Sequence, residues 1–380
     1  MQQVYFDNAA TTQIRDEVIA SMVEVMKTNY GNASSSHSFG RSSKVLIEKS
    51  RKAVASYLNV SASEIIFTSG GTEADNLILL SAVRDLKVTH IITSKIEHHA
   101  VLHTVDQLVK DYKISVSYVD LKPNGKIDYL HLETLLKSES KTLVSLMHIN
   151  NEIGNVLNLE RVASLCKANN ALFHSDTVQS VGHYKLDLQA TQVDFITGAA
   201  HKFHGPKGVG FAFIRKNSGL KPLIFGGEQE RGLRAGTESV HNIVGMEIAL
   251  KSAYENLEKE AAYIKGLKQY FIHNIETNIP NATFNGKSGD MEKSTYTLVN
   301  VCLPIPPKKA AMLLFQLDLK GIACSKGSAC QSGSNQNSHV LTEILNAEDL
   351  QKPSIRFSFS IYNTKEEIDY LVEVLKDFSI

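Results

Sequence analysis

Short runs of β-forming residues alternate with longer helical patterns from about residue 60 to residue 215. Stretches such as Glu73–Leu86 and Leu159–Asn169 carry apolar residues at helix-compatible spacing. Alternation of this kind is typical of an α/β domain with a mostly parallel central sheet. The candidate strands are Ile65–Thr68, His90–Thr93, Leu143–Met147, Leu172–Ser175, Val193–Thr197 and Val209–Ile214.

The order of elements changes beyond about residue 260, where the sequence predicts a smaller α+β unit. The 380 residues also exceed the size at which one core keeps growing, which favours two packed units. The polar segment Ser325–Ser338 is predicted to be a long loop, and such loops are usually functional or disordered. The other predicted elements are the strand Thr297–Cys302, a helix near Ala310–Leu317, the strand Ile355–Ile361 and the closing helix Lys365–Phe378.

The charge balance argues against nucleic acid and anionic membranes as partners. Lys+Arg and Asp+Glu both number 40, so the chain has no global field of either sign. The first residues, Met1–Tyr5, lack a signal-peptide pattern, and no apolar run is long enough to span a bilayer. We therefore expect a protein of the reducing cytoplasm.

The four cysteines form no Cys-x-x-Cys pair, so neither a zinc site nor a thioredoxin-type motif is indicated and no metal ligand set is expected. Cys166 and Cys302 lie in apolar stretches typical of inert core thiols. Cys324 and Cys330 share a segment rich in Ser and Gly, which is a different environment.

Lys202 stands in the context that a pyridoxal-phosphate enzyme requires. It follows the small residues Thr197–Ala200, which permit a ring and a phosphate to approach the backbone closely. In such enzymes a lysine holds the cofactor aldehyde as a Schiff base, and a carboxylate, here Asp176, keeps the pyridine nitrogen protonated. Gln179 is placed to bond the phenolic oxygen of the ring, and His201 is suited to donate to the phosphate. The plainer alternatives are a solvated lysine and a turn or helix-cap aspartate.

Further polar residues follow other predicted strands. Thr68–Glu73 ends a strand and opens a helix, so free amides at Gly71 and Thr72 form either a phosphate cradle or an ordinary capped turn. His98 follows the strand His90–Thr93 and is either a ring-stacking acid/base or a half-buried structural histidine. Four such signals fall at the carboxyl ends of predicted parallel strands, where ligands bind in open α/β sheets.

Two further residues are suited to contact a substrate. Asn151 lies in the turn Asn150–Gly154, which is either a plain turn or a set of polar contacts for a carboxylate and a ring oxygen. Arg356 alternates with apolar residues on a predicted strand, and its guanidinium could clamp an α-carboxylate with two hydrogen bonds. The alternative for Arg356 is a plain strand-face arginine.

Taken together, these residues resemble the cysteine desulfurases, which are fold type I pyridoxal-phosphate enzymes of the class-V aminotransferase group. The matching motifs run through nearly the whole chain, and the Gly-Ser-Ala-Cys segment with its long loop resembles the housekeeping, iron–sulfur assembly type. The motifs are Tyr5–Thr12, Gly31-Asn32, Ser36-His37, Phe67–Glu73, Glu97-His98, His148–Gly154, Asp176–Ser180, His201-Lys202, Arg231–Thr237, Gly327–Cys330 and Ile355–Ser358.

The resemblance implies a role for each position. Lys202 is expected to be the Schiff-base lysine and α-proton base, His98 the stacking acid/base, and Cys330 the nucleophile that becomes a persulfide. Thr237 is expected to reach the phosphate of the neighbouring subunit in a homodimer. The remaining expected assignments are Asp176 on the pyridine nitrogen, Gln179 and Asn151 on ring and substrate oxygens, Gly71, Thr72 and His201 on the phosphate, and Arg356 on the substrate carboxylate.

The resemblance also implies the overall organisation and activity. Residues 14–260 would form the large cofactor-binding domain, and residues 1–13 and 261–380 the small domain with the cysteine loop at about 325–338. The enzyme would convert L-cysteine to L-alanine and pass sulfur from Cys330 to an acceptor such as an iron–sulfur scaffold, with transient iron–sulfur contact through Cys330 as its one metal contact. A selenocysteine lyase or an aminotransferase of the same fold is the alternative, and Cys324 is expected to be structural.

One position departs from the family pattern beside the lysine. A serine that usually contacts the phosphate is replaced by Ala199. The loss removes a hydroxyl donor that contributes about 1 kcal/mol when neutral, so we expect weaker cofactor retention without loss of activity. A second departure is Thr177-Val178 between Asp176 and Gln179, where the family has alanine at the first of these two positions.

Overall fold

The computed structural model describes residues 2–138, 140–306, 310, 312–327 and 338–379. Cys330 and most of the predicted cysteine loop lie outside these described residues.

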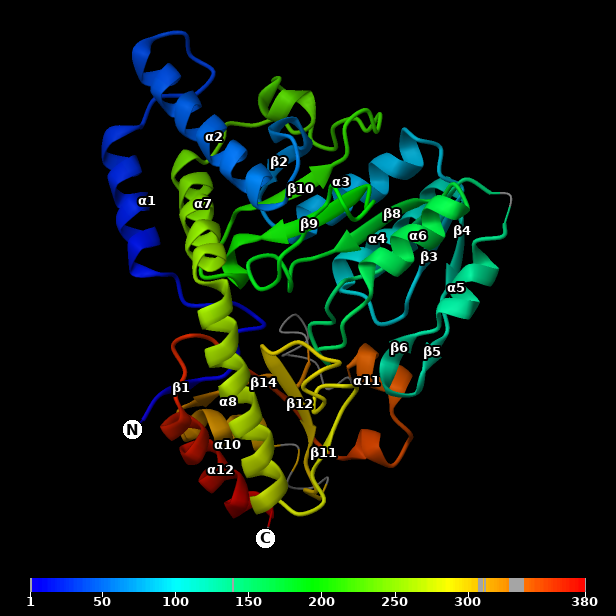
Figure 1. The fold of residues 1–380 in the computed structure, drawn as a ribbon, viewed down its shortest axis with the longest axis vertical. Coiled ribbons are helices and arrows are strands. Elements are labelled where there is room, and N and C mark those ends of the chain that lie inside the picture. Colours follow the sequence, from blue (N-terminus) through cyan, green and yellow to red (C-terminus); the bar gives the residue numbers. More distant parts are fainter. Residues whose placement is uncertain (1, 139, 307–309, 311, 328–337, 380) are drawn as a thin grey trace.

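A seven-stranded sheet forms the centre of the larger half of the molecule (Figure 1). The strand order is β2-β10-β9-β8-β7-β3-β4, with β4, β3, β7, β8 and β9 parallel. β10 runs antiparallel to both of its neighbours. It is antiparallel to β9 because a short connection joins the two strands, and a parallel return would need a crossover of a dozen or more residues. The predicted α/β class with a mostly parallel sheet is confirmed. The strands are β2 Ile65–Thr68, β3 His90–Thr93, β4 Ser115–Tyr118, β7 Thr142–Ser145, β8 Leu172–Asp176, β9 Phe195–Ala199 and β10 Gly210–Ile214.

Helices cover both faces of this sheet. Successive strand residues point to opposite faces, so Phe67 packs in the cluster beneath α1, α2, α6 and α7, whereas Ile66 packs with α3 and α4. All four residues of each of β2, β3 and β7 are buried, as expected for strands covered on both sides. The helices are α1 Asp16–Thr28, α2 Ser38–Tyr57, α3 Gly71–Arg84, α4 His99–Tyr112, α6 Leu159–Ala168 and α7 Val240–Glu255.

The smaller half of the molecule, seen in Figure 1, is built from the N-terminal strand and the chain beyond α7. Its buried apolar residues form a second cluster. Val4 and Phe6 from the N-terminal segment lie in this cluster, since β1 pairs with β13 near the other end of the chain. A three-stranded antiparallel sheet, ordered β11-β12-β14, packs against α8, α10 and α12. The proposed boundary near residue 260 stays a prediction. The elements are β1 Val4–Tyr5, α8 Leu257–Asn278, β11 Thr283–Phe284, β12 Leu298–Cys302, α10 Leu313–Leu319, β13 Ile322–Ala323, β14 Ser354–Ser358 and α12 Lys365–Ser379.

Short elements complete the described chain. β5 Leu121–Lys122 and β6 Lys126–Ile127 form a separate two-stranded ribbon, followed by α5 Tyr129–Leu135, and α11 His339–Ile344 follows the cysteine segment. Among the helices that the structure describes, none is long and apolar enough to cross a bilayer.

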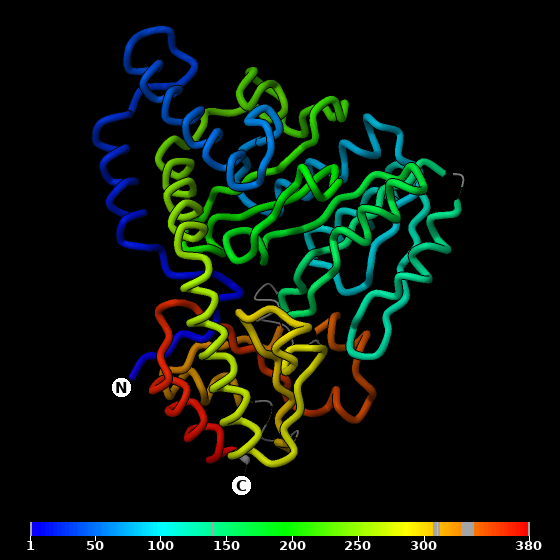
Figure 2. Tube along the Cα trace, in the orientation of Figure 1, coloured from blue at the N-terminus to red at the C-terminus, as the bar shows by residue number. Residues whose placement is uncertain are grey.

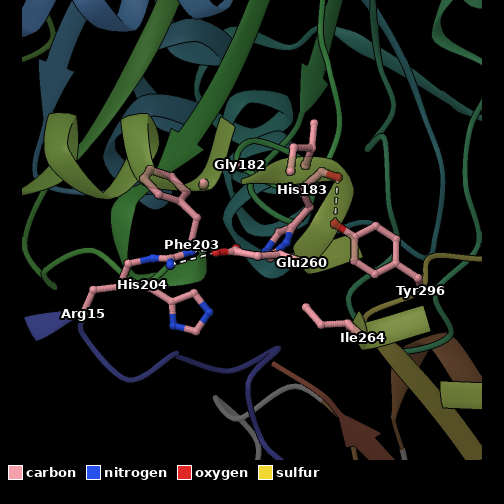
Figure 3. A pocket seen from close by; sticks show the side chains of 10 residues that line it. Arg15, Gly182, His183, Phe203, His204, Glu260, Ile264 and Tyr296 are labelled. Carbon is pink, nitrogen blue, oxygen red and sulfur yellow. Dashed lines mark hydrogen bonds and ion pairs between the residues drawn. The ribbon is translucent and has the colours of Figure 1, made fainter. Parts of the chain in front are cut away.

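The N-terminal segment joins the two halves, as the blue end of the tube shows in Figure 2. At this joint Arg15 makes two hydrogen bonds of 2.9 and 2.7 Å to the Glu260 carboxylate on α8 (Figure 3). On the other side of the same small pocket the Tyr296 hydroxyl donates to the His183 carbonyl at 2.8 Å (Figure 3). A side-chain nitrogen of His183 lies 2.9 Å from the Lys202 carbonyl oxygen. The joint therefore lies directly against the backbone of the predicted catalytic lysine.

Candidate active site

Lys202 ends the single 3-10 turn Ala200–Lys202 that follows β9. Its Nζ donates to the Ala9 carbonyl at 2.6 Å and to the Ala10 carbonyl at 2.8 Å. Thr12 fixes the same turn, since its amide and its hydroxyl both donate to the His201 carbonyl. The N-terminal segment, from the smaller half of the molecule, thus forms one wall beside the lysine.

Asp176 is the last residue of β8 and is buried. Its Oδ1 accepts a hydrogen bond from the Val178 amide at 2.9 Å, so it is a turn aspartate as well as a candidate for the ring nitrogen. Burial raises the pKa of its carboxyl to about 7, and the neighbouring Asp75 adds to this, while Lys202 acts in the opposite direction. Such a carboxyl is suited to a cationic partner, which would compensate its charge.

Asp75 is a buried carboxylate at this site that the sequence analysis missed. Its Oδ1 accepts from the Thr197 hydroxyl at 2.8 Å and lies 3.3 Å from the Nε2 of His174. Carboxylate oxygens of Asp75 and Asp176 and a ring nitrogen of His98 lie within 4.8 Å of one another. The available signal was a charged residue on the buried face of α3, between Ala74 and Leu77.

His98 is the N-cap residue of α4, and its Nδ1 accepts from the Ala100 amide at 3.1 Å. Burial, followed by the positive charge of Lys202, lowers the pKa of its imidazole to about 4. The ring is therefore neutral near pH 7. Since Nδ1 accepts, the proton resides on Nε2, which leaves an N–H to face a ligand.

Gly71 and Thr72, two of the residues predicted to hold a phosphate, lie at the start of α3, whereas His201 lies in the turn after β9. No side chain caps this helix within the described chain, and its N-cap is Gly70. A Cβ on Gly71 would lie 2.8 Å from Cγ2 of Val178, so only glycine leaves this approach open. Thr72 is exposed there, and Nδ1 of His201 lies 3.2 Å from the Thr11 hydroxyl.

An ion pair between Glu73 and Arg234 stabilises the turn that precedes α3. Glu73 accepts from the Ser69 amide at 2.8 Å, and its other oxygen pairs with Arg234 at 2.9 Å. These contacts also lower the pKa of the Glu73 carboxyl, although burial acts against them. Thr237, three residues beyond Arg234, is exposed in the single chain and lies in the same loop.

Arg356 is buried on β14 and is held by two neighbours. One guanidinium nitrogen donates to the Asn151 carbonyl at 2.8 Å, and another pairs with the Asp7 carboxylate at 2.8 Å. Its Nε is buried without a hydrogen-bond partner in the described part of the chain. The pairing with Asp7 is a second contact that sequence reasoning missed, although Asp7 lies in a quoted motif. The Gln179 side chain donates to the Ala9 carbonyl at 2.9 Å, the same carbonyl that accepts from Lys202.

The donor set fits pyridoxal phosphate. Asp176 supplies an anionic partner for a ring nitrogen, Lys202 an amine for the aldehyde, and the uncapped start of α3 a site for the phosphate. Gly71 leaves room where a side chain would block the approach to Val178. Of the predicted residues, Cys330 lies outside the described chain. Thr237 lies in the loop after Arg234, which pairs with Glu73 in the first turn of α3.

Comparison with known proteins identifies the class that this fold and site define. A family model described as aminotransferase class-V matches residues 4–371, and the chain belongs to that family. Cysteine desulfurase IscS of Dictyoglomus turgidum (strain DSM 6724 / Z-1310) is 39% identical over 377 residues, covering 99% of this chain and 94% of the relative. The resemblance to the cysteine desulfurases is thereby confirmed.

Solved structures agree with this assignment. A NifS-like protein matches with a TM-score of 0.90 and 36% identity, and the match covers 99% of both chains. A structure described as SspA in complex with cysteine matches with a TM-score of 0.81 and 30% identity, covering 95% of this chain and 100% of the other.

Proposed function

We propose that this chain is a pyridoxal-phosphate-dependent cysteine desulfurase that converts L-cysteine to L-alanine and retains the sulfur on Cys330 as a persulfide. The observation that carries the proposal is the convergence of Lys202, Asp176 and His98 at the carboxyl edge of the sheet, in a chain whose relatives are named cysteine desulfurases. Cysteine is also the molecule named with one of the matching structures.

Pyridoxal phosphate, when bound, would supply an electron-accepting ring that stabilises negative charge at the substrate Cα. Lys202 would bind its aldehyde, Asp176 its ring nitrogen, and Gly71, Thr72 and His201 its phosphate. Gln179 and Asn151 would contact oxygens of the ring and substrate. The neutral His98 ring would stack on the cofactor and donate a hydrogen bond from its Nε2.

Arg356 would orient the substrate by binding its α-carboxylate. Its buried Nε is a donor without a partner in the described chain, and an arginine fork pairs best with a carboxylate. Asp7 and Asn151 already fix the plane of the guanidinium, so little side-chain entropy is lost when the substrate binds. The Lys202 amine would then take the Cα proton.

Cys330 would complete the reaction as a thiolate. Its sulfur attacks the substrate sulfur, an S–S bond forms, and the C–S bond breaks with its electron pair passing to the carbon side. Protonation at the former Cβ and Cα yields alanine, so one sulfur atom is transferred and no external oxidant or reductant is needed. An unperturbed thiol is only a few per cent ionised at pH 7, so a nearby base that removes its proton accelerates this step.

The described ends of the cysteine loop support this placement. Ser338 donates a hydrogen bond to the Glu152 carboxylate, and a Cβ on Gly327 would lie 3.0 Å from the same carboxylate. Glu152 is the neighbour of Asn151, which contacts Arg356. Both ends of the segment that contains Cys330 therefore lie at the substrate side of the site. The predicted cysteine loop covers about residues 325–338. Since an extended chain spans about 3.3 Å per residue, a loop of this length would allow the Cys330 thiol to reach an acceptor protein.

The finer parts of the proposal concern partners and location. We propose a cytoplasmic homodimer in which Thr237 reaches the phosphate of the other subunit, and a sulfur-acceptor protein such as an iron–sulfur scaffold. Neither nucleic acid nor a membrane is a proposed partner. A solution mass equal to that of two chains would support the homodimer, and the mass of one chain would contradict it.

The test is to supply L-cysteine and a reductant and to measure alanine. Wild-type protein should release alanine and sulfide in equal amounts. Cys330→Ala should still show a change in cofactor absorbance on cysteine addition but release neither product. Consumption of cysteine with formation of the corresponding keto acid would instead identify an aminotransferase. Retained selenocysteine cleavage in Cys330→Ala would identify a selenocysteine lyase.

A further inference from the structure

A second carboxylate lies beside the one expected to bind the cofactor ring. Asp75 is 1% exposed and Asp176 is 6% exposed, and their oxygens lie within 4.8 Å of each other. They come from different elements, α3 and β8, so the fold brings them together at one point of the sheet edge. Two carboxylates at this separation repel each other strongly in a buried site.

The hydrogen bonds to Asp75 come from neutral groups. The Thr197 hydroxyl on β9 donates to Oδ1, and the Nε2 of His174 on β8 lies 3.3 Å away. Burial lowers the pKa of the His174 imidazole to about 4, so this ring is uncharged near pH 7. The Ser145 hydroxyl on β7 lies 2.9 Å from the other nitrogen of the ring. The Asp75 carboxylate is thus oriented by this network, and none of these groups supplies a compensating positive charge.

The other titratable groups that act on the pair are Glu97, His98 and Lys202. Glu97 is buried, and burial raises the pKa of its carboxyl to about 8, so it is largely protonated at pH 7. His98 is neutral, and Lys202 is the nearby cation whose charge lowers the pKa of Asp176. Burial likewise raises the pKa of Asp75 to about 7. The pair therefore favours a cation in the space that Asp176 faces.

We propose that Asp75 is a positioning residue that acts through Asp176: the two neighbouring carboxylates together favour the protonated, cationic form of the ring nitrogen of pyridoxal phosphate. This inference rests on the proposed function, because it requires the cofactor ring at Asp176. Asp176 makes the direct contact, and Asp75 adds a second negative charge behind it. The Thr197–His174–Ser145 network fixes that charge in place.

The test compares cofactor binding by the apoprotein with and without the ring nitrogen. The probes are pyridoxal phosphate and its 1-deaza analogue, in which carbon replaces the ring nitrogen while the aldehyde, phenol and phosphate are kept. The measured quantity is the dissociation constant of the 1-deaza analogue divided by that of pyridoxal phosphate. This ratio isolates the interaction of the carboxylates with the ring cation. Changes in folding or in the phosphate cradle affect both probes and cancel in the ratio.

Asp75→Asn should reduce the preference for pyridoxal phosphate by about tenfold, the equivalent of one pKa unit at the ring nitrogen. The matched control is Asp194→Asn, which removes a half-buried carboxylate at the other end of β9, where it accepts from the Phe173 amide. The control should leave the ratio unchanged. Should Asp75→Asn fail to fold, Thr197→Val is the second variant. It keeps the Asp75 carboxylate but removes the hydroxyl that donates to it, and it should also lower the ratio.

An unchanged ratio in Asp75→Asn, with both affinities lowered equally, would overturn the inference and leave Asp75 a structural residue. Failure of the cofactor assignment has a different signature, because wild-type protein would then bind neither probe. A second readout is the ¹⁵N resonance of cofactor labelled at the ring nitrogen. It should show deprotonation at lower pH in Asp75→Asn than in wild type.

Discussion

Burial sets the charge state of each side chain at the residue scale. The same desolvation lowers the pKa of His98 to about 4 and raises that of Asp176 to about 7, because it disfavours the charged form of either group. The His98 imidazole is therefore neutral near pH 7, and the Asp176 carboxylate would be stabilised by a cationic partner. Ala199 is the neighbour of this set that lacks a polar group. It is 1% exposed, and its Cβ faces the start of α3 near Gly71.

Ala199→Ser should strengthen retention of pyridoxal phosphate. A hydroxyl at this position adds one donor toward the phosphate, which contributes about 1 kcal/mol and corresponds to roughly fivefold in the dissociation constant. The measurement is a cofactor titration of the apoprotein followed by absorbance. Ala200→Ser, one residue along the turn, is the control and should give no gain. Equal affinity of Ala199→Ser and wild type would show that the missing serine has no bearing on cofactor retention.

At the scale of elements, the sequence predicted what depends on local pattern. The six strands between residues 65 and 214 and the helices α3 and α6 follow from apolar periodicity and agree to within a few residues. β4 was missed because Ser115–Tyr118 is partly exposed and lacks the continuous apolar run of the buried strands β2, β3 and β7. Asp75 and the Asp7–Arg356 pair were missed because they depend on contacts between distant segments, which periodicity does not encode.

The turn between Lys202 and β10 packs against the N-terminal segment, and this contact can be tested through His204. His204 is buried there with φ of 67°, and its Nδ1 lies 2.8 Å from the Gln13 carbonyl. Burial lowers the pKa of its imidazole to about 3 in the folded protein. The unfolded chain protonates at about 6.5, so this group's stabilisation is complete above that pH and declines toward about pH 3.

His204→Asn should therefore reduce the acid sensitivity of folding, since asparagine tolerates the left-handed backbone and does not titrate. The gap in unfolding free energy between wild type and variant should shrink by about 1.4 kcal/mol per pH unit below pH 6.5. Urea unfolding of the apoprotein at pH 7 and pH 5 measures it. The exposed His273→Asn serves as control. A gap that is the same at both pH values would contradict the account.

At the scale of the whole molecule, the site exists only where the two halves meet. The larger half supplies Lys202, Asp176 and His98 from the sheet edge, and the smaller half supplies Arg356 and the N-terminal segment that contacts the lysine. The ends of the cysteine segment lie against Glu152 at the same boundary. The fold thus brings a cofactor site and a sulfur carrier together, although they are more than a hundred residues apart in the chain.

The most direct test of persulfide formation on Cys330 is mass spectrometry of the protein after exposure to L-cysteine without reductant. The peptide that contains Cys330 should carry one added sulfur atom in wild type and in Cys324→Ala. It should carry none in Lys202→Ala, which cannot activate the substrate. Alanine formation with no added sulfur on Cys330, or with the sulfur on Cys324, would contradict the central claim.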